Sequence, residues 1–221
     1  MHFLPAGIKI SGFSRNISGK KMKEVWNQRF DTEGFAYGKE PNVFFREQLW
    51  EKKFGRVLLP AEGEGRDAVY AAKRGWLVHA VDFSEVAAAK AIQFANSEGV
   101  RIEYQISDLA SFETAQDYYH LISVSFLHLL PEQRKHFHRK MIQSLVPGGT
   151  FIAEYFSIKQ LPLNTGGPKN PLMLYTLEDL RTDFEGMDFQ ILSEELREME
   201  NGLYHFDASW VIRVKALKPC L

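Results

Sequence analysis

The sequence VLLPAEGEGRDAVYAAKRGWLVHAVDFS, residues 57–84, predicts a strand, a glycine turn, a helix and a second strand. An apolar run opens the stretch, and Gly63 and Gly65 interrupt it. Asp67 stands near the expected helix start, and Gly75 stands where the helix should end. The second strand then ends on Asp82.

This arrangement has the parts of half a nucleoside-binding site. Two glycines let a ligand approach the backbone closely, and the N–H groups that open the following helix favour negative charge. A carboxylate at the tip of the second strand can accept hydrogen bonds from two ribose hydroxyls. The dinucleotide fingerprint needs a third glycine, and Ala68 stands in its place. A glycine pair also fits an ordinary turn, so this motif alone leaves both interpretations open.

Composition limits the class of protein. The chain has 221 residues and a formal net charge of −1, so we expect one α/β domain without a global field for nucleic acid or anionic lipid. The single cysteine, Cys220, rules out an internal disulfide and a cysteine metal site. No apolar run approaches the roughly 20 residues of a membrane span, and the first residues lack the features of a secretory signal. We therefore expect a cytoplasmic protein with no membrane or nucleic-acid partner, and no metal.

The N-terminal region divides into a tail and a helical cover. Residues 1–21 have no periodicity and are interpreted as a disordered tail, or as residues upstream of a natural start at Met22. Residues 22–53 are expected to form a helix, an aromatic loop and a second helix that Asn42 caps. Tyr37 lies in the loop and is either core packing or part of a cover over the glycine turn.

Further strands and helices follow Asp82. Ser84 is expected to cap a helix to about Asn96, and strands are expected over residues 100–106, 118–126 and 150–156. The alternation of strands and helices predicts a doubly wound, Rossmann-like parallel sheet. Ligands of such sheets bind beyond the carboxyl ends of the strands, where several polar residues should gather. These residues are Glu62, Gly63, Asp82, Asp108, Ser125 and His128.

The last third changes character. Residues 157–175 read as a long loop with glycines and prolines, of the kind used as a lid or binding loop. Thr176 and Asp179 predict a helix start. Two long strands then flank Asn201-Gly202, a type I′ hairpin signal, and must be antiparallel. The predicted fold is a mixed seven-stranded sheet closed by a C-terminal antiparallel hairpin, in one domain over residues 22–221.

Taken together, these motifs resemble the class I S-adenosylmethionine-dependent methyltransferases, and within them the branch of tellurite-resistance and thiopurine-type enzymes. The stretches that carry the resemblance lie at residues 26–42, 61–76, 80–84, 126–129, 138–149 and 166–180. They touch most of the chain after Met22. In two places the chain departs from the superfamily pattern: Leu59 stands where an acid is usual, and Ala61 replaces the first glycine. Glu62 is our hypothesis for the missing carboxylate.

The resemblance implies a role for each of these positions. It places Glu62, Gly63 and Gly65 around the methionine part of S-adenosylmethionine. It also implies that the remaining cofactor-binding residues divide between the ribose (Asp82), the adenine (Phe83, Asp108 and Leu109), the floor of the site (Ser125 and Phe126) and its closure (Tyr37).

The implied reaction is methyl transfer to a small-molecule acceptor, which we expect to be a soft nucleophile such as a thiol, selenium or tellurium compound. In-line displacement at a sulfonium needs mainly alignment. An oxygen or nitrogen nucleophile would need a base, for which His128 and His205 are the candidates. Either histidine could equally be structural. The alternatives are a methyltransferase that acts on a macromolecule and a non-catalytic S-adenosylmethionine-binding module. We expect a monomer or a homodimer.

Overall fold

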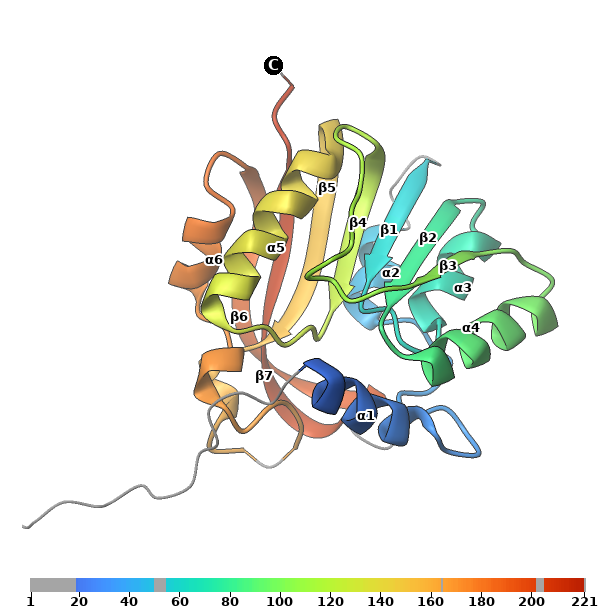
Figure 1. Cartoon of the computed structure of the whole chain (residues 1–221). Helices are drawn as coiled ribbons and strands as arrows, with labels where there is room; N and C mark the ends of the chain where they lie inside the picture. Colours follow the sequence, from blue (N-terminus) through green and yellow to red (C-terminus); the bar gives the residue numbers. More distant parts are fainter. Residues whose placement is uncertain (1–18, 50–54, 164, 202–204, 221) are drawn as a thin grey trace, which may run out of the picture.

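The architecture is a seven-stranded sheet with helices on both faces (Figure 1). The computed structural model describes residues 19–49, 55–163, 165–201 and 205–220. The strand order is β3-β2-β1-β4-β5-β7-β6, in which β1 to β5 are parallel while β7 runs antiparallel to β5 and β6 to β7. The predicted mixed, doubly wound sheet is confirmed. The strands are β1 (Arg56–Pro60), β2 (Leu77–Asp82), β3 (Glu103–Ile106), β4 (Tyr119–Ser125), β5 (Leu145–Phe156), β6 (Asp188–Asn201) and β7 (His205–Leu217).

Two apolar cores lie on the two faces of the sheet. One is built around α5 (Pro131–Ser144) and α6 (Leu177–Asp183), whose Phe137 and Phe184 pack against β4, β5 and β7. The other lies under α2 (Val43–Leu49) and α3 (Arg66–Lys73) and includes Phe44 and Phe45. Beyond α3, α4 (Glu85–Ser97) packs against α3 and β3. Helix α1 (Gly19–Phe30) lies across the carboxyl ends of the strands (Figure 1).

Local signals set most helix ends as predicted. The Ser84 hydroxyl accepts a hydrogen bond from Ala87 N at 3.1 Å, and the Asn42 side chain accepts one from Phe45 N at 3.0 Å. Caps of this kind contribute about 1 kcal/mol each. Thr176 and Asp179 form the predicted reciprocal capping box at the start of α6. Helix α3 begins at Arg66, directly after Gly65, and Asp67 lies in its first turn, near the helix start as predicted.

The structure corrects three expectations about connections. Residues 107–118, between β3 and β4, form turns and contain no helix, so the strict alternation breaks there. Strand β5 begins at Leu145, before the predicted turn, because Gly148 N and Gly149 O pair with Lys218. Residues 157–175 are not structureless, since they contain two short 3₁₀ helices, η1 (Ile158–Gln160) and η2 (Pro171–Met173), and Ser157 bridges to Tyr175.

The C-terminal hairpin has a different register from the prediction. Asn201 pairs with His205, whereas a two-residue Asn-Gly turn would pair the residues on either side of Asn201 and Gly202. Residues 202–204 lie outside the described part of the chain, as do the predicted tail up to residue 18 and positions 50–53 of the predicted cover.

Candidate functional site

The glycine turn and Asp82 meet at the carboxyl edge of the sheet. Strands β1 and β2 are paired in register up to Pro60 and Val81, so the turn after β1 comes to lie beside the end of β2. Gly63 N donates a hydrogen bond to Asp82 Oδ2 at 3.1 Å. Ser84 N donates to Asp82 Oδ1 at 2.9 Å. The carboxylate is thereby held in a fixed orientation by two backbone amides.

Asp82 is buried, with only 4% of its surface exposed. Burial raises the pKa of this carboxyl group to about 6, against the lowering effect of the amides of Ser84, Gly63 and Phe83. A carboxylate can accept about four hydrogen bonds, and the two described here leave acceptor capacity for a ligand's hydroxyl groups. The group therefore fits the ribose-binding role that the resemblance implies.

The turn has left-handed backbone at every second residue from Ala61 to Gly65. Ala61 has φ 55°, Gly63 has φ 64° and Gly65 has φ 88°. Gly65 is required twice over, because a Cβ there would lie 2.7 Å from the Cβ of Ala91 in α4. Ala61 adopts the same left-handed conformation, which costs a residue with a Cβ about 1 kcal/mol. A glycine, which the superfamily pattern has at this position, would avoid that cost.

Glu62 lies between these residues, and its carboxyl group faces the start of α3. Glu62 Oε1 accepts a hydrogen bond from Ala68 N at 2.7 Å. Burial, and then the nearby charge of Asp67, raise the pKa of Glu62 well above its ordinary value. In the structure this carboxyl group therefore caps α3, and the proposal that it replaces the missing acid at position 59 stays a hypothesis.

The residues assigned to adenine form a looser group. Phe83 follows Asp82 and is half-buried. Ser107 N donates to Asp82 O at 2.9 Å, which places the next residue, Asp108, beside the end of β2. The exposed Asp108 side chain accepts from Ala110 N at 2.9 Å and closes its own turn. Leu109 packs against the core on the α5 face.

Ser125 belongs to a chain of hydrogen bonds that joins three segments. Its hydroxyl donates to Asp67 Oδ2 at 2.9 Å, and Asp67 Oδ1 accepts from Asn42 N at 2.7 Å. The Asn42 side chain in turn donates to Glu154 Oε2 at 2.6 Å. Sequence reasoning assigned Asp67 and Asn42 only to helix starts. Their partners lie 25 to 112 residues away in the sequence, so no local signal announced them.

A second group lies at the end of β4. Phe126 has φ 57°, a strained value for an aromatic residue, and its ring lies 4.8 Å from that of Phe156. The ring of His128 stacks on Phe156 at 5.9 Å. Nδ1 of His128 is buried and forms no hydrogen bond with the described residues. Its lone pair or proton therefore remains available to a ligand.

Burial, and then the charge of the nearby Arg29 guanidinium, lower the pKa of His128 to about 4. Arg29 Nη1 donates a hydrogen bond to the Tyr37 hydroxyl at 3.0 Å. Tyr37 packs between Trp26 and Phe30, at ring distances of 6.4 and 6.3 Å. The structure thus brings both Tyr37 and His128 close to Arg29. The sequence analysis did not single out this arginine.

His205, the other candidate base, begins β7 opposite Asn201. Its side chain lies outside the described part of the structure. Its catalytic role stays a prediction.

Lys90 in α4 connects the N-terminal cover to the glycine turn. Its Nζ donates to the carbonyl oxygens of Phe30 at 2.7 Å, Thr32 at 3.0 Å and Gly34 at 2.6 Å. It also pairs with Glu64 Oε1 at 2.7 Å, while Glu64 Oε2 accepts from Ala36 N at 2.8 Å. Phe30 reaches the turn itself, since its Cζ lies 3.2 Å from where a Cβ of Gly63 would stand.

His138 illustrates a buried histidine of the structural kind. His138 Nδ1 lies 2.8 Å from Asp183 and Nε2 lies 2.9 Å from the Tyr155 hydroxyl. Arg134 pairs with the same Asp183 at 2.6 Å. His136 is exposed, so the two histidines point to different sides of α5.

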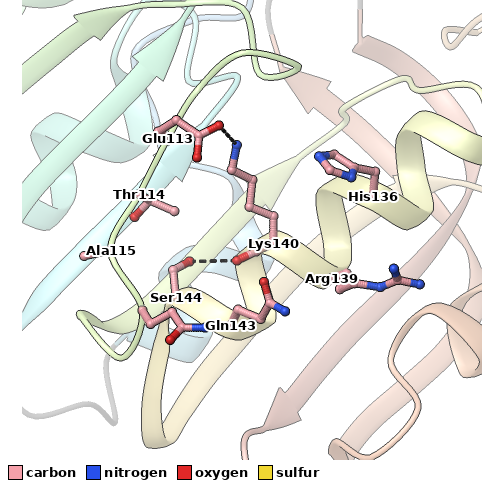
Figure 2. A pocket seen from close by; sticks show the side chains of 9 residues that line it. Glu113, Thr114, Ala115, His136, Arg139, Lys140, Gln143 and Ser144 are labelled. Atoms are coloured by element: carbon pink, nitrogen blue, oxygen red, sulfur yellow. Dashed lines mark hydrogen bonds and ion pairs between the residues drawn. The ribbon is translucent and has the colours of Figure 1, made fainter.

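A hollow of about 230 Å³ lies at the opposite edge of the sheet, between the loop before β4 and the second half of α5. Figure 2 shows Lys140 there turned toward Glu113, with which it pairs at 2.8 Å. None of the predicted site residues lines it. Within the described ranges, no helix has the length and apolar character to cross a membrane, and no group of three or more His, Cys, Asp or Glu side chains is placed to hold a metal ion.

Comparisons with known proteins agree with this geometry. Residues 57–149, less than half of the chain, match the family model of a methyltransferase domain. The matched range contains the glycine turn, Asp82, Asp108 and His128. No curated protein matches the chain.

Similar solved structures include three with this fold. A protein of echinomycin biosynthesis, from work on the conversion of a disulfide bond into a thioacetal group, is 17% identical with a TM-score of 0.72, over 90% of this chain and 92% of that one. TehB from Haemophilus influenzae is 15% identical with a TM-score of 0.67, over 89% and 66%. The N-methyltransferase NodS from Bradyrhizobium japonicum WM9, in complex with S-adenosyl-L-homocysteine, is 14% identical with a TM-score of 0.63, over 88% and 97%.

The domain match confirms the prediction of a methyltransferase over residues 57–149, and the neighbours confirm the fold. S-adenosylmethionine as the methyl donor is part of the function proposed below. The assignment to the tellurite-resistance and thiopurine-type branch stays a prediction.

Proposed function

We propose that this chain, an S-adenosylmethionine-dependent methyltransferase, methylates a small molecule at a soft nucleophile: a thiol, or a selenium or tellurium compound. The observation that carries the proposal is the chemistry around His128. Its pKa of about 4 makes it a weak base at neutral pH, and no other titratable side chain was predicted to act there except His205.

A general base works best when its pKa lies near the working pH. An alcohol or a protonated amine needs such a base before it can attack. A thiolate or a chalcogenide anion is already ionised and needs none. His128 therefore suits a role in positioning the acceptor through its free Nδ1, rather than in removing a proton.

Arg29 adds an electrostatic preference. Its guanidinium is permanently charged, donates to Tyr37, and acts on the His128 ring. A cation at this position lowers the pKa of a bound thiol and attracts an anionic acceptor. It would disfavour a cationic amine.

The donor side of the site is formed by the glycine turn and β2. When bound, S-adenosylmethionine supplies a methyl group on a sulfonium, whose sulfur is a good leaving group. Asp82 would hold its ribose, Phe83 and Asp108 would meet its adenine, and the turn at Gly63 and Gly65 would face its methionine part. Closure of the N-terminal cover over this edge would exclude water that solvates an anionic nucleophile.

The fold alone does not select the acceptor. One neighbour comes from work on sulfur chemistry, the conversion of a disulfide bond into a thioacetal group, and another is an N-methyltransferase. The choice of a soft nucleophile therefore rests on His128 and Arg29.

The test is a methyl-transfer assay with isotopically labelled S-adenosylmethionine and an acceptor panel. The panel contains an aromatic thiol, an aliphatic thiol, selenite and tellurite, matched with a phenol and a primary amine of the same skeletons. Product is identified by mass spectrometry, and Asp82→Ala serves as the donor-site control. We expect methylated product from at least one soft nucleophile and none from its oxygen or nitrogen analogue. Methylation of the phenol or amine in preference to the thiol would overturn the acceptor class, and no turnover with any acceptor despite binding of the methyl donor would favour a binding module.

A further inference from the structure

A second hollow, of about 290 Å³, lies beside the N-terminal cover on the α2 face of the sheet. Its walls come from three segments: the end of the cover loop with Pro41, the start of α2 with Val43 and Arg46, and the strands β5 and β6. Pro41 and Met199 are buried and Val43 is half-buried, so one wall is apolar. This volume lies at the small end of ligand sites in proteins, about 300–1,000 Å³.

The charge of Glu154, at the wall of the hollow, already has partners. Glu154 Oε1 accepts from Arg213 Nε at 2.9 Å, and its Oε2 accepts from Asn42 at 2.6 Å. Arg213 also pairs with Glu195 at 3.1 Å. The Glu154 charge is thereby taken up within the protein.

Arg197 is less completely paired: it forms an ion pair with Glu154 but no hydrogen bond to it. It projects from β6 on the same sheet face as Arg213, because their register partners alternate in step along the two strands. Its closest described partner is Glu154 Oε1, at 3.6 Å from Arg197 Nη1, which is too long for a hydrogen bond. Arg197 Nη1 is buried and forms no hydrogen bond with the described residues. A buried guanidinium N–H without an acceptor is costly, so an acceptor from a ligand would relieve it.

The other charged residues at the hollow do not oppose an anion strongly. Arg46 is exposed at its wall and adds a second cation. Glu40 is exposed, so solvent screens its charge. Glu198 also lines the hollow and is exposed, so solvent screens its charge too.

We propose that this hollow binds a small aliphatic carboxylate, with its carboxylate on Arg197 and Arg46 and its hydrocarbon part against Pro41, Val43 and Met199. Guanidinium groups suit planar carboxylates because they offer paired donors. Because one wall of the hollow is apolar, a ligand with a hydrocarbon part should bind better than an inorganic anion. This ligand site is independent of the acceptor class proposed above.

The experiment is calorimetric titration of the full chain with three ligands of one skeleton: 4-methylpentanoate, 4-methylpentan-1-ol and 4-methylpentan-1-amine. Each titration is carried out with saturating S-adenosylhomocysteine, so that the carboxylate cannot bind where the cofactor's own carboxylate binds. We expect binding of 4-methylpentanoate alone. Arg197→Met should weaken it by about tenfold or more, because a hydrogen bond to a charged group is lost.

The control is Arg101→Met, which removes an exposed arginine ahead of β3 that lines no part of the hollow. It should leave the affinity unchanged. Arg46→Met is the second variant, and it should weaken binding even if Arg197→Met does not fold, as circular dichroism would show. Absence of carboxylate binding, equal binding of the alcohol, or affinity that survives both Arg46→Met and a folded Arg197→Met would overturn the proposal.

Discussion

Replacing Lys90 by methionine should loosen the N-terminal cover and destabilise the whole chain. The substitution keeps the length and apolar stem of the side chain while removing its charge and its four short contacts. The Glu64 side chain is only 3% exposed and would lose its cationic partner, keeping the Ala36 amide.

The size of the effect follows from burial. Removing one partner of a buried ion pair costs about 3–5 kcal/mol. The Lys90 side chain is 18% exposed and Glu64 retains one hydrogen bond, so we expect about 2–4 kcal/mol. For a chain of this length, that corresponds to a Tm lower by roughly 5–15 °C.

The chain supplies a matched control in Lys73. It pairs with Glu98 at 2.6 Å, almost the same distance as Lys90 to Glu64 at 2.7 Å, but the two side chains are 52% and 35% exposed. Lys73→Met should cost less than about 1 kcal/mol. Urea unfolding of both variants, with Glu64→Gln added to Lys90→Met, measures the difference. Equal losses for Lys90→Met and Lys73→Met, or no recovery in the double variant, would refute the assignment of Lys90 as the residue that holds the cover.

Three further predictions concern titration and buried charge. Affinity for S-adenosylhomocysteine should fall as the pH drops through about 6, because protonated Asp82 loses an acceptor for the ribose. Calorimetry between about pH 5 and pH 8 should show this fall. The pH dependence should vanish in Asp82→Asn. His128→Gln should retain methyl-transfer activity within about tenfold of the unmodified chain. Loss of a general base would instead lower kcat by a factor of about 10²–10⁴, and a loss of that size would make His128 the base. Arg134→Met should destabilise the chain by about 3–5 kcal/mol in urea, since it leaves the buried Asp183 without its ion pair, whereas the exposed Lys135→Met should have little effect. The carboxyl group of Asp183 has a lowered pKa through its hydrogen bonds to His138 and Arg134, opposed by burial, so its contribution to stability is complete above the ordinary pKa and is lost as the pH falls through the lowered value.

The features that the sequence predicted are those that short segments determine. The glycine turn needs left-handed backbone at Gly63 and Gly65, and the position of Asp82 follows from the length of β2. The caps at Ser84 and Thr176 involve residues three positions apart. Each depends on a few neighbouring residues, so pattern and propensity were sufficient.

The features that it did not predict depend on contacts between distant segments. Lys90 has partners 26 to 60 residues away, and nothing in the sequence of α4 separates it from an ordinary exposed lysine. The register of the β6–β7 hairpin is set over the whole length of two strands, which outweighs the Asn201-Gly202 turn preference. Pro147, Gly148 and Gly149 read locally as a turn, but Lys218, directly after β7, pairs with this segment and extends β5.

His128 and His138 both have a lowered pKa, and their hydrogen bonds tell the two histidines apart. His138 is fully buried and its pKa is lowered by burial, yet both ring nitrogens have partners and no group is left for a ligand. His128 has a lowered pKa for the same reason, but its Nδ1 is unpaired, and it lies two residues after the strained Phe126. A protein gains no stability from a strained aromatic residue and an unpaired buried nitrogen, so their presence together at the carboxyl edge indicates a binding requirement. A perturbed pKa alone is common to structural and functional sites, so it is the unpaired atom that supports our proposal of an acceptor site at the end of β4.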